Sequence, residues 1–327
     1  MYEQFYGLRE RPFDLTPNPR YLYLTEGHRE ALSNLQYGIT GRKGMTLLIG
    51  EAGTGKTTMV RAALEAVGGP SVRCVYVSNP ALSREEFYEF LAPKFGLSER
   101  AAVSKARFLS DLEETVIERH RAGGVTALVI DEAQSLSHEL LEEVRLLANF
   151  ETATEKLLPV VLAGQPELAA RLENEELRQL KQRVALRCDL SALDLSETAA
   201  YISGRIAIAG GDSTHIFTRA AVRTIYERSR GIPRTISVIC DNTLLTGLAA
   251  GVKPVGSNLV LEVCRDFRLP QFKVGELTPV REPPSPSNGS GTMPGAPPVA
   301  TPERLQRQRD GGMFSHYTKK KRFSFFG

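Results

Sequence analysis

The segment Gly50–Thr57, G-E-A-G-T-G-K-T, constrains this chain most, because it matches the phosphate-binding loop pattern G-x-x-x-x-G-K-[ST] in full. The apolar run 45–49 before it suits a buried parallel strand, and 58–64 after it is typical of the opening of a helix. Glycines let such a loop wrap tightly, so that successive backbone N–H groups point at phosphate oxygens near a helix N-terminus. A glycine-rich turn that merely caps a helix would not require this strand before it. The pattern predicts a nucleoside triphosphate site at Gly50, Glu51, Ala52, Gly53, Thr54, Gly55, Lys56, Thr57 and Thr58.

Lys56 and Thr57 of this loop, and Asp131 and Glu132 beyond it, have predicted chemical roles. Lys56 is expected to neutralise the β- and γ-phosphates, and the Thr57 hydroxyl to ligate Mg²⁺. The segment 127–132 is an apolar strand pattern that ends in Asp131 and Glu132. Because adjacent residues of a strand point to opposite sides, the two acids are expected to do different work. Asp131 would hold Mg²⁺, directly or through its water, and Glu132 would act as general base toward the attacking water, unless the pair only caps a helix or a solvated strand end.

Gln165 and Arg234 follow two predicted structural boundaries. Gln165 comes just after the strand pattern 159–163, where sheet geometry would place its amide near the γ-phosphate. Arg234 follows Gly231-Ile232-Pro233 at the start of a predicted helix. An arginine held by that turn can contact the γ-phosphate across a cleft between domains and couple the nucleotide state to the angle between them.

Arg183 lies in the predicted helix 174–184, near the edge of the core. One interpretation is an arginine finger that reaches the γ-phosphate of a neighbouring subunit. The other is an exposed surface arginine, which the spacing alone favours equally. Arg178 and Arg187 are the alternative fingers.

From residue 45 to residue 190 the chain alternates between strand and helix patterns, and from 191 to 269 it is all-helical. Alternation predicts an α/β fold, a parallel sheet covered by helices on both faces with ligands at the carboxyl ends of its strands. The second range predicts a smaller helical domain. We expect strands at 45–49, 72–77, 125–130, 159–163 and 186–190, core helices at 83–96, 103–121, 138–149 and 174–184, and helices of the smaller domain at 197–209, 219–229, 233–250 and 258–267.

The two ends differ from this body. Residues 1–44 form a lead-in, in which 11–19 holds three prolines and is expected to run extended, before a helix at 28–38. Residues 270–327 are rich in Pro, Ser and Gly, which predicts a disordered linker. At its end, 314–326 interleaves cations with aromatic rings. That pattern suits an anionic membrane, a partner protein or a nucleic acid, or else a solvated terminus.

Composition bounds the partners and the compartment. The 24% of charged residues is ordinary, and a formal net charge of +3 is too small to indicate nucleic acid or membrane by itself. Residues 303–327 hold seven Lys or Arg and two acids, so the rest of the chain carries a charge of −2. The four cysteines form no C-x-x-C pair and are expected to be buried thiols in a reducing compartment. Neither a signal peptide nor a run of about 18 apolar residues is visible, so we expect a cytoplasmic protein.

Several motifs together resemble an AAA+ ATPase, and more closely the ExeA-type family, general secretion pathway protein A and its relatives. The likeness spans about residues 1–268. The motifs are Pro12-Phe13 with Leu15-Thr16-Pro17, His28 with Glu30-Ala31-Leu32, Asp131-Glu132-Ala133-Gln134, Leu162-Ala163-Gly164-Gln165-Pro166-Glu167-Leu168, and Gly231-Ile232-Pro233-Arg234, with Asn149, Glu151-Thr152, Gln179-Leu180 and Gln182-Arg183 in addition.

This resemblance implies ATP and Mg²⁺ as ligands and a ring or filament of identical subunits as the active form. It makes Gln165 the sensor 1 residue, Arg234 the sensor 2 residue and Arg183 the finger. It also implies that 191–269 is a lid and that the N-terminal segment lines the adenine pocket. Secretion members typically continue through a transmembrane helix into a periplasmic, peptidoglycan-binding part. This sequence shows neither, so direct assistance of secretin assembly across the cell wall is not expected.

Two functions follow from these expectations. The first is a Mg²⁺-dependent ATPase that drives assembly of an envelope or export system from the cytoplasm or the inner face of the membrane, with a protein of that system as partner. The second is an ATP-switched helper that binds DNA, as transposition ATPases related to this family do. A scaffold that binds ATP without turnover is disfavoured because Glu132 is present.

Overall fold

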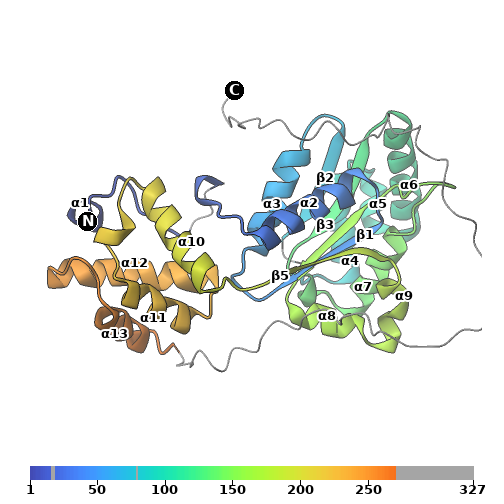
Figure 1. The fold of residues 1–327 in the computed structure, drawn as a ribbon. Helices are drawn as coiled ribbons and strands as arrows, with labels where there is room; N and C mark the ends of the chain where they lie inside the picture. Colours follow the sequence, from blue (N-terminus) through green and yellow to red (C-terminus); the bar gives the residue numbers. More distant parts are fainter. Residues whose placement is uncertain (16–18, 79, 270–327) are drawn as a thin grey trace, which may run out of the picture. The chain divides into compact units, whose positions relative to one another are not determined.

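The computed structural model of the chain describes residues 1–15, 19–78 and 80–269. Residues Met1–Leu277 form one compact unit, and the second unit, Thr278–Gly327, falls outside the described residues. The predicted linker and its basic, aromatic end, 270–327, therefore lie outside them too. Figure 1 shows the helices and strands of the first unit.

A five-stranded parallel sheet in the order β2-β3-β4-β1-β5 forms the centre of the core (Figure 1). All five predicted strands are present, with bounds that differ from the expected ones by two residues at most. Apolar runs favour strands buried on both faces, as a helix-covered parallel sheet requires, and the three central strands are such runs. The strands are β1 (Met45–Gly50), β2 (Val72–Val77), β3 (Val125–Ile130), β4 (Val160–Gly164) and β5 (Val184–Leu190).

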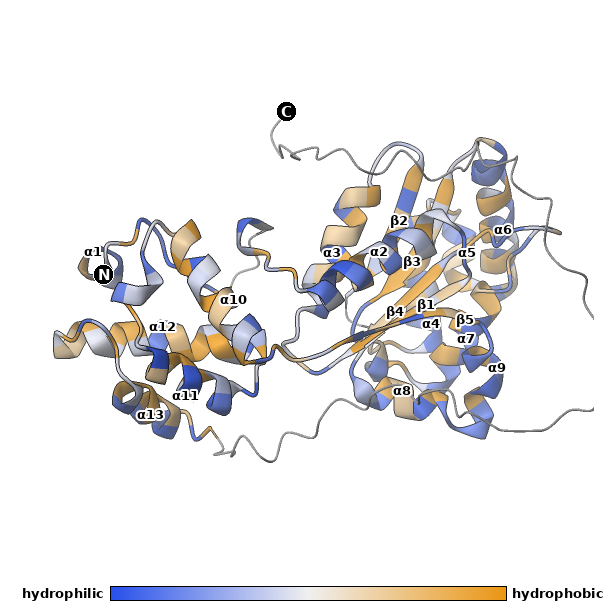
Figure 2. Ribbon diagram, viewed as in Figure 1, coloured by the Kyte–Doolittle hydropathy of each residue, from blue (hydrophilic) through white to orange (hydrophobic). Residues whose placement is uncertain are grey.

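Helices cover both faces of the sheet, which confirms the predicted three layers. On one face α2 and α3 pack against side chains such as Leu48 and Val129. On the other, α4 to α9 pack against side chains such as Leu47 and Leu128. Figure 2 shows the apolar strands between these amphipathic helices. The helices are α2 (Glu26–Thr40), α3 (Lys56–Val67), α4 (Arg84–Phe95), α5 (Glu99–Val103), α6 (Lys105–Arg121), α7 (His138–Leu147), α8 (Pro166–Leu172) and α9 (Arg178–Lys181).

The parallel register aligns the carboxyl ends of three strands. Ile49 of β1 pairs with Gly164 of β4, and Ile130 of β3 pairs with Leu162 of β4. The phosphate loop, the two carboxylates and Gln165 begin just after these residues. They therefore leave the sheet at one edge.

The predicted helix 103–121 is present as α6, which begins two residues later than expected, directly after Ser104. This residue has an extended backbone, with φ of −138° and ψ of 114°, and it ends α5. Its hydroxyl accepts the backbone N–H of Arg107 and so caps the start of α6. The cap therefore sets the start of α6, and α5 is a separate short helix that the sequence did not predict.

The predicted helix 174–184 is shorter than expected. It consists of a 3-10 turn, η3 (Glu175–Leu177), followed by the four residues of α9. Val184 already pairs with Met45 in the sheet. Strand pairing at the edge of β1 therefore overrides the local helical pattern.

The second part of the unit is all-helical and has an apolar core of its own, as expected for a lid. Two of its helices have the predicted bounds, and the other two differ by at most two residues. Pro233 occupies the first turn of its helix, where no backbone N–H is needed. The helices are α10 (Leu195–Ile208), α11 (Arg219–Ser229), α12 (Pro233–Ala250) and α13 (Ser257–Asp266), with a 3-10 turn, η4 (Ser213–His215), between the first two.

The start of the lead-in belongs to this lid core. Residues 11–15, the first part of the range expected to run extended, form no helix, but Phe13 packs into the lid core. The sequence did not predict the short helix α1 (Tyr2–Tyr6). Its first and last residues, Tyr2 and Tyr6, are buried in the apolar core of the lid. The Tyr2 hydroxyl donates to Asp241 of α12. Phe13 is 1% exposed and packs edge-on against Phe217 of the lid. The chain is thus anchored in the lid before α2 packs on the sheet.

All four cysteines are free thiols, and three of them are buried. Burial raises the pKa of the partly buried Cys74 to about 11. Among the described residues, no helix is long and apolar enough to cross a membrane.

Candidate nucleotide-binding site

The phosphate loop connects β1 to α3 through two glycines with left-handed backbones. Gly53 has φ of 84° and Gly55 has φ of 103°, angles that L side chains rarely adopt. Thr54 tightens the turn, because its hydroxyl donates to the Glu51 carbonyl at 2.8 Å. The first residue of α3 is Lys56. The loop therefore brings backbone N–H groups to the N-terminus of a 12-residue helix, a favourable place for an anion.

Lys56 is buried in the loop that it belongs to, with 4% of its surface exposed. Its Nζ donates to the Gly50 carbonyl at 2.8 Å and to the Glu51 carbonyl at 3.1 Å. Burial lowers the pKa of this ammonium, while Glu132 and Asp131 act to raise it. The cation is thus held at the loop with acidic groups nearby.

Asp131 is the buried acid of the pair, with 2% exposed, and it collects three hydrogen bonds. Its Oδ2 accepts the Thr57 hydroxyl at 2.6 Å and the Tyr76 hydroxyl at 2.9 Å. Its Oδ1 accepts the backbone N–H of Glu132 at 2.9 Å. Burial, followed by Asp131, raises the pKa of Tyr76 to about 12. Sequence reasoning missed Tyr76, whose only signal was its place near the end of the strand beside β3.

The donors present fit a magnesium ion. The Thr57 and Asp131 oxygens lie close enough for one cation to contact both, and hard oxygen ligands are those that Mg²⁺ prefers. Because Thr57 and Asp131 come from α3 and the end of β3, the sheet itself sets this pair.

Glu132 has a left-handed backbone, with φ of 53°, unusual for a residue with a side chain. It begins the short turn η2 (Ala133–Ser135) and lines the pocket. Its Oε2 accepts Gln134 Nε2 at 2.5 Å and Gln165 Nε2 at 3.4 Å. The structure therefore joins the predicted base to the predicted sensor through one carboxylate oxygen. Sequence reasoning gave Gln134 no role.

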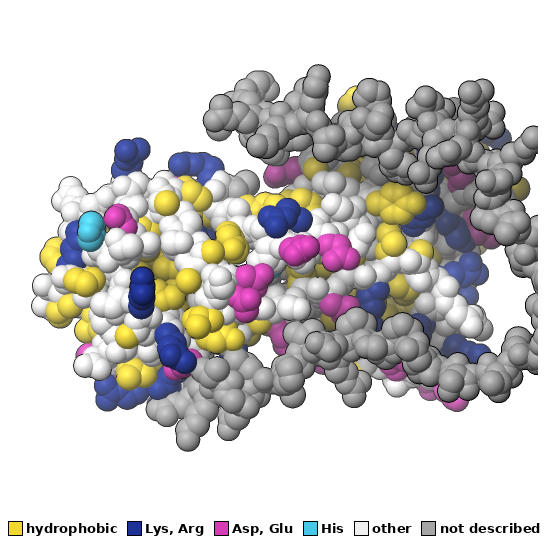
Figure 3. All heavy atoms as spheres, viewed as in Figure 1, with side chains coloured by type: hydrophobic (Ala, Val, Ile, Leu, Met, Phe, Trp, Pro, Cys, Tyr) yellow, Lys and Arg dark blue, Asp and Glu magenta, His cyan; other side chains and the backbone are white. Residues whose placement is uncertain are grey.

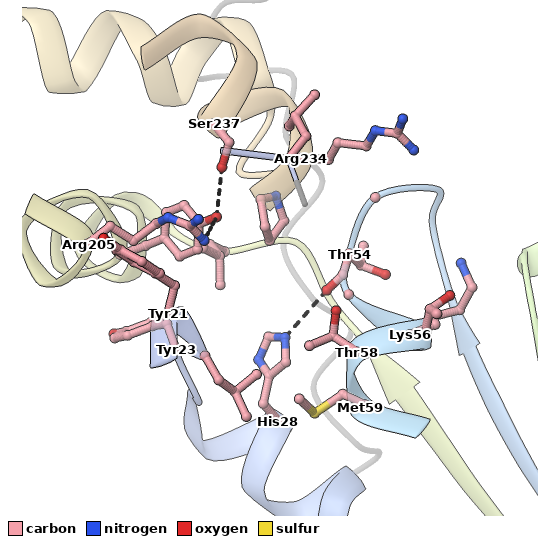
Figure 4. A pocket seen from close by; sticks show the side chains of 18 of the residues that line it. Tyr21, Tyr23, His28, Thr54, Lys56, Thr58, Met59, Arg205, Arg234 and Ser237 are labelled. Atoms are coloured by element: carbon pink, nitrogen blue, oxygen red, sulfur yellow. Dashed lines mark hydrogen bonds between the residues drawn. The ribbon is translucent and has the colours of Figure 1, made fainter. Parts of the chain in front are cut away.

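Arg234 lies directly against the phosphate loop. Its backbone N–H donates to the Gly53 carbonyl at 3.2 Å, and Pro233 precedes it in the first turn of α12. A Cβ at Gly53 would come within 2.9 Å of the Arg234 Cβ. Figure 4 shows Arg234 beside the loop that carries Lys56.

The pocket, of about 350 Å³, is lined by the loop, the lid and the end of the lead-in (Figure 4). Arg205 of α10 closes the lid side. Its guanidinium lies over the rings of Tyr21 and Tyr201, 4.8 and 5.3 Å from their centroids. It also donates to the Pro12 carbonyl at 2.5 Å and to the Asp14 carbonyl at 3.3 Å. Arg205 thus ties the lead-in to the lid at the pocket.

His28 connects α2 to the phosphate loop and is 6% exposed. Its Nδ1 lies 2.7 Å from the Thr25 hydroxyl, and its Nε2 lies 3.5 Å from the Thr54 carbonyl (Figure 4). Burial lowers the pKa of this imidazole, so the ring is neutral at pH 7. It serves as a neutral link beside the phosphate site.

Arg183 does not line this pocket. It is exposed and immediately precedes Val184, which pairs with Met45 at the start of β1. The phosphate loop begins at the other end of β1, about 17 Å away at the rise of a parallel strand. Arg178 is exposed on α9, and Arg187 is paired with Asp189 at 3.1 Å. None of the three candidate fingers lines the pocket of its own chain.

Comparison with known proteins shows two similarities. The AAA domain family matches residues 39–172. General secretion pathway protein A of Aeromonas hydrophila is 40% identical over 251 residues, which are 77% of this chain and 46% of that protein. These matches confirm the predicted resemblance to the ExeA-type family of AAA+ proteins over most of this chain. It spans about half the length of this curated relative.

Solved structures confirm the AAA+ fold. The ORC2 protein of Aeropyrum pernix, in ADPNP and ADP complexes, has a TM-score of 0.58 at 17% identity and matches 83% of this chain and 74% of its own. Drosophila ORC bound to DNA has a TM-score of 0.59 at 18% identity, with coverages of 79% and 65%. At such identities the likeness concerns the fold alone. An AAA+ fold with this phosphate loop is a nucleotide-binding fold.

We expect Gly53→Ala to weaken nucleotide binding at least about tenfold. The new Cβ would sit on a left-handed backbone and press on Arg234, so either the loop or the start of α12 must move. Titration with a fluorescent ATP analogue measures the change. Gly204→Ala is the matched control, because a Cβ there meets open space within α10. It should leave affinity unchanged and stabilise the protein by about 0.5–1 kcal/mol. If Gly53→Ala binds the nucleotide with wild-type affinity, the contact between the loop and the lid does not contribute to binding.

Proposed function

We propose that this AAA+ protein is a Mg²⁺-dependent ATPase. The observation that carries the proposal is the arrangement around Glu132. A carboxylate held by two amides lies at the same sheet edge as the Thr57–Asp131 pair and the phosphate loop. This is the set of groups that phosphoryl transfer to water requires: phosphate donors, metal ligands and a base.

Each group has a distinct task in this mechanism. The loop N–H groups and Lys56 bind the β- and γ-phosphates, and Arg234 approaches from the lid side. Thr57 and Asp131 would hold Mg²⁺, which supplies electrostatic stabilisation of the phosphate oxygens when bound. Glu132 accepts a proton from the water whose oxygen attacks the γ-phosphorus as the bond to the β-phosphate oxygen breaks. Gln165 hydrogen-bonds the same carboxylate and so lies where it can respond to the γ-phosphate.

Glu132→Gln should bind ATP with wild-type affinity but release phosphate at least about 100-fold more slowly, since a general base contributes about 10² to 10⁴ in rate. Steady-state phosphate release and titration with a fluorescent ATP analogue measure the two effects. Lys56→Ala is the comparison variant and should lose nucleotide affinity itself, because it removes the loop cation. Turnover at the wild-type rate in Glu132→Gln would exclude this residue as the base.

We further propose that Arg183 acts on the nucleotide of a neighbouring subunit in a ring or filament. Its place at the start of β5, far from the loop of its own chain, supports a role in trans. A finger contributes about 10³-fold or more in other phosphoryl-transfer proteins.

Arg183→Ala should lower turnover by at least about 100-fold while its own nucleotide site stays intact. Lys56→Ala has the opposite defect, an intact Arg183 and an impaired site. Mixing the two inactive variants should restore activity in those sites of Arg183→Ala subunits that face a Lys56→Ala neighbour. Each variant mixed with itself is the control. If the mixture stays inactive although both variants co-assemble, the role in trans is wrong.

As its cellular role, we propose assembly or function of a bacterial export or envelope system, from the cytoplasm or the inner face of the membrane. The 40% identity to a general secretion pathway protein supports this role. The alternative is a DNA-binding helper. The face drawn in Figure 3 shows basic side chains scattered among acidic ones, in keeping with a near-neutral body.

Phosphate release by the full chain should rise on addition of anionic vesicles and stay unchanged with duplex DNA. The assay compares these additions at equal ionic strength, because nonspecific contacts with phosphates weaken with salt. Stimulation by DNA alone would favour the helper role over the export role.

A further inference from the structure

We propose that Gln134 is a positioning residue for hydrolysis, which holds the Glu132 carboxylate and links it to the strand that delivers Gln165. This inference rests on the proposed ATPase function. It starts from the carboxamide of Gln134, whose two ends bind different partners. Nε2 donates to Glu132 Oε2 at 2.5 Å, and Oε1 accepts the backbone N–H of Gln165 at 3.1 Å.

The second contact fixes the orientation of the amide. A backbone N–H can only donate, so the side-chain atom facing Gln165 must be the carbonyl oxygen. The NH₂ group is then directed at Glu132 and cannot be exchanged with the oxygen. Gln134 therefore acts as a bridge with a defined direction, from the backbone after β4 to the carboxylate after β3.

The turn that carries Gln134 is itself held in place. Arg171 of α8 donates from Nη1 to the Gln134 and Leu136 carbonyls, both at 2.8 Å. A Cβ at Gly164 would lie 3.2 Å from Gln134 Oε1, so the glycine at the end of β4 leaves room for the amide. Arg171 thus holds the backbone of this turn, and the end of β4 leaves space for the Gln134 side chain.

The hydrogen bonds of Gln134 restrict the Glu132 carboxylate, which would otherwise be free to rotate because its side chain is flexible. Glu132 also has a left-handed backbone. Gln134 and Gln165 both donate to Oε2, so one amide from the turn η2 and one from the segment after β4 hold the same oxygen. A carboxylate held in this way keeps one orientation toward the water, and misplacement by about 1 Å is worth about 100-fold in rate. Any shift of Gln165 with the state of the γ-phosphate would also move the Gln134 amide, through the backbone N–H that it accepts.

Gln134→Glu is the informative substitution. It has the same length and still accepts the Gln165 N–H, but it removes the donor to Glu132 and places a like charge there. We expect kcat to fall about 10- to 100-fold. The KM for ATP and the affinity for a fluorescent ATP analogue should stay within about twofold of wild type, and the melting temperature within a few degrees. Gln134→Asn keeps both functions on a shorter side chain, should show the same split, and replaces Gln134→Glu if that variant fails to fold. Gln4→Ala, an exposed glutamine on α1, is the control.

The double variant separates positioning from a structural role. If Gln134 acts through Glu132, adding Gln134→Glu to Glu132→Gln should cause no further loss of turnover. Losses that multiply would overturn the inference, as would a kcat within twofold of wild type in Gln134→Glu, or nucleotide affinity that falls together with kcat. Absence of phosphate release in the wild-type chain would instead contradict the proposed ATPase function.

Discussion

The parallel pairing of β4 between β1 and β3 is the constraint on which the site depends. Side chains alternate along a strand, so a slip of one residue would turn each strand's buried face outward. The apolar residues of all three strands are packed by helices on both faces, which fixes the register. With that register fixed, the phosphate loop, Asp131 and Gln165 leave the sheet at one edge. The apolar packing that sets the register involves none of the site residues, yet it determines where those residues lie.

The lid and the lead-in form the other side of the pocket, and they pack together although they lie at opposite ends of the described chain. The first residues of the chain complete the core of the last domain, and Arg205 holds Pro12 and Asp14 at the pocket. The lid also touches the loop through Arg234 and Gly53. A shift of the loop on nucleotide binding would therefore act on the lid through Arg234, which is the contact that the predicted coupling of nucleotide state to lid angle requires.

The sequence predicted what local patterns and motifs encode. Buried strands appear in the sequence as apolar runs. The phosphate loop is recognisable because its left-handed backbone angles favour glycine, so both features were predicted. Helix 174–184 was overestimated because strand pairing of Val184 is a tertiary effect. Tyr76, Gln134 and Arg205 were missed for a similar reason, since each has a partner that is distant in the chain or in a separate element. The domain boundaries and the roles of the site residues stay predictions.

The position of Arg183 bears on how subunits of this protein would assemble. It lies just before β5, whereas the phosphate loop follows the end of β1, so the two features lie at opposite ends of neighbouring parallel strands. A contact between them in neighbouring subunits joins two different surfaces and is heterologous, which produces rings when the rotation closes and filaments when it does not. In either assembly, the nucleotide of one subunit would lie between its own lid and a neighbour's arginine. Lid movement set by the loop–Arg234 contact would then reach the next subunit through the same nucleotide.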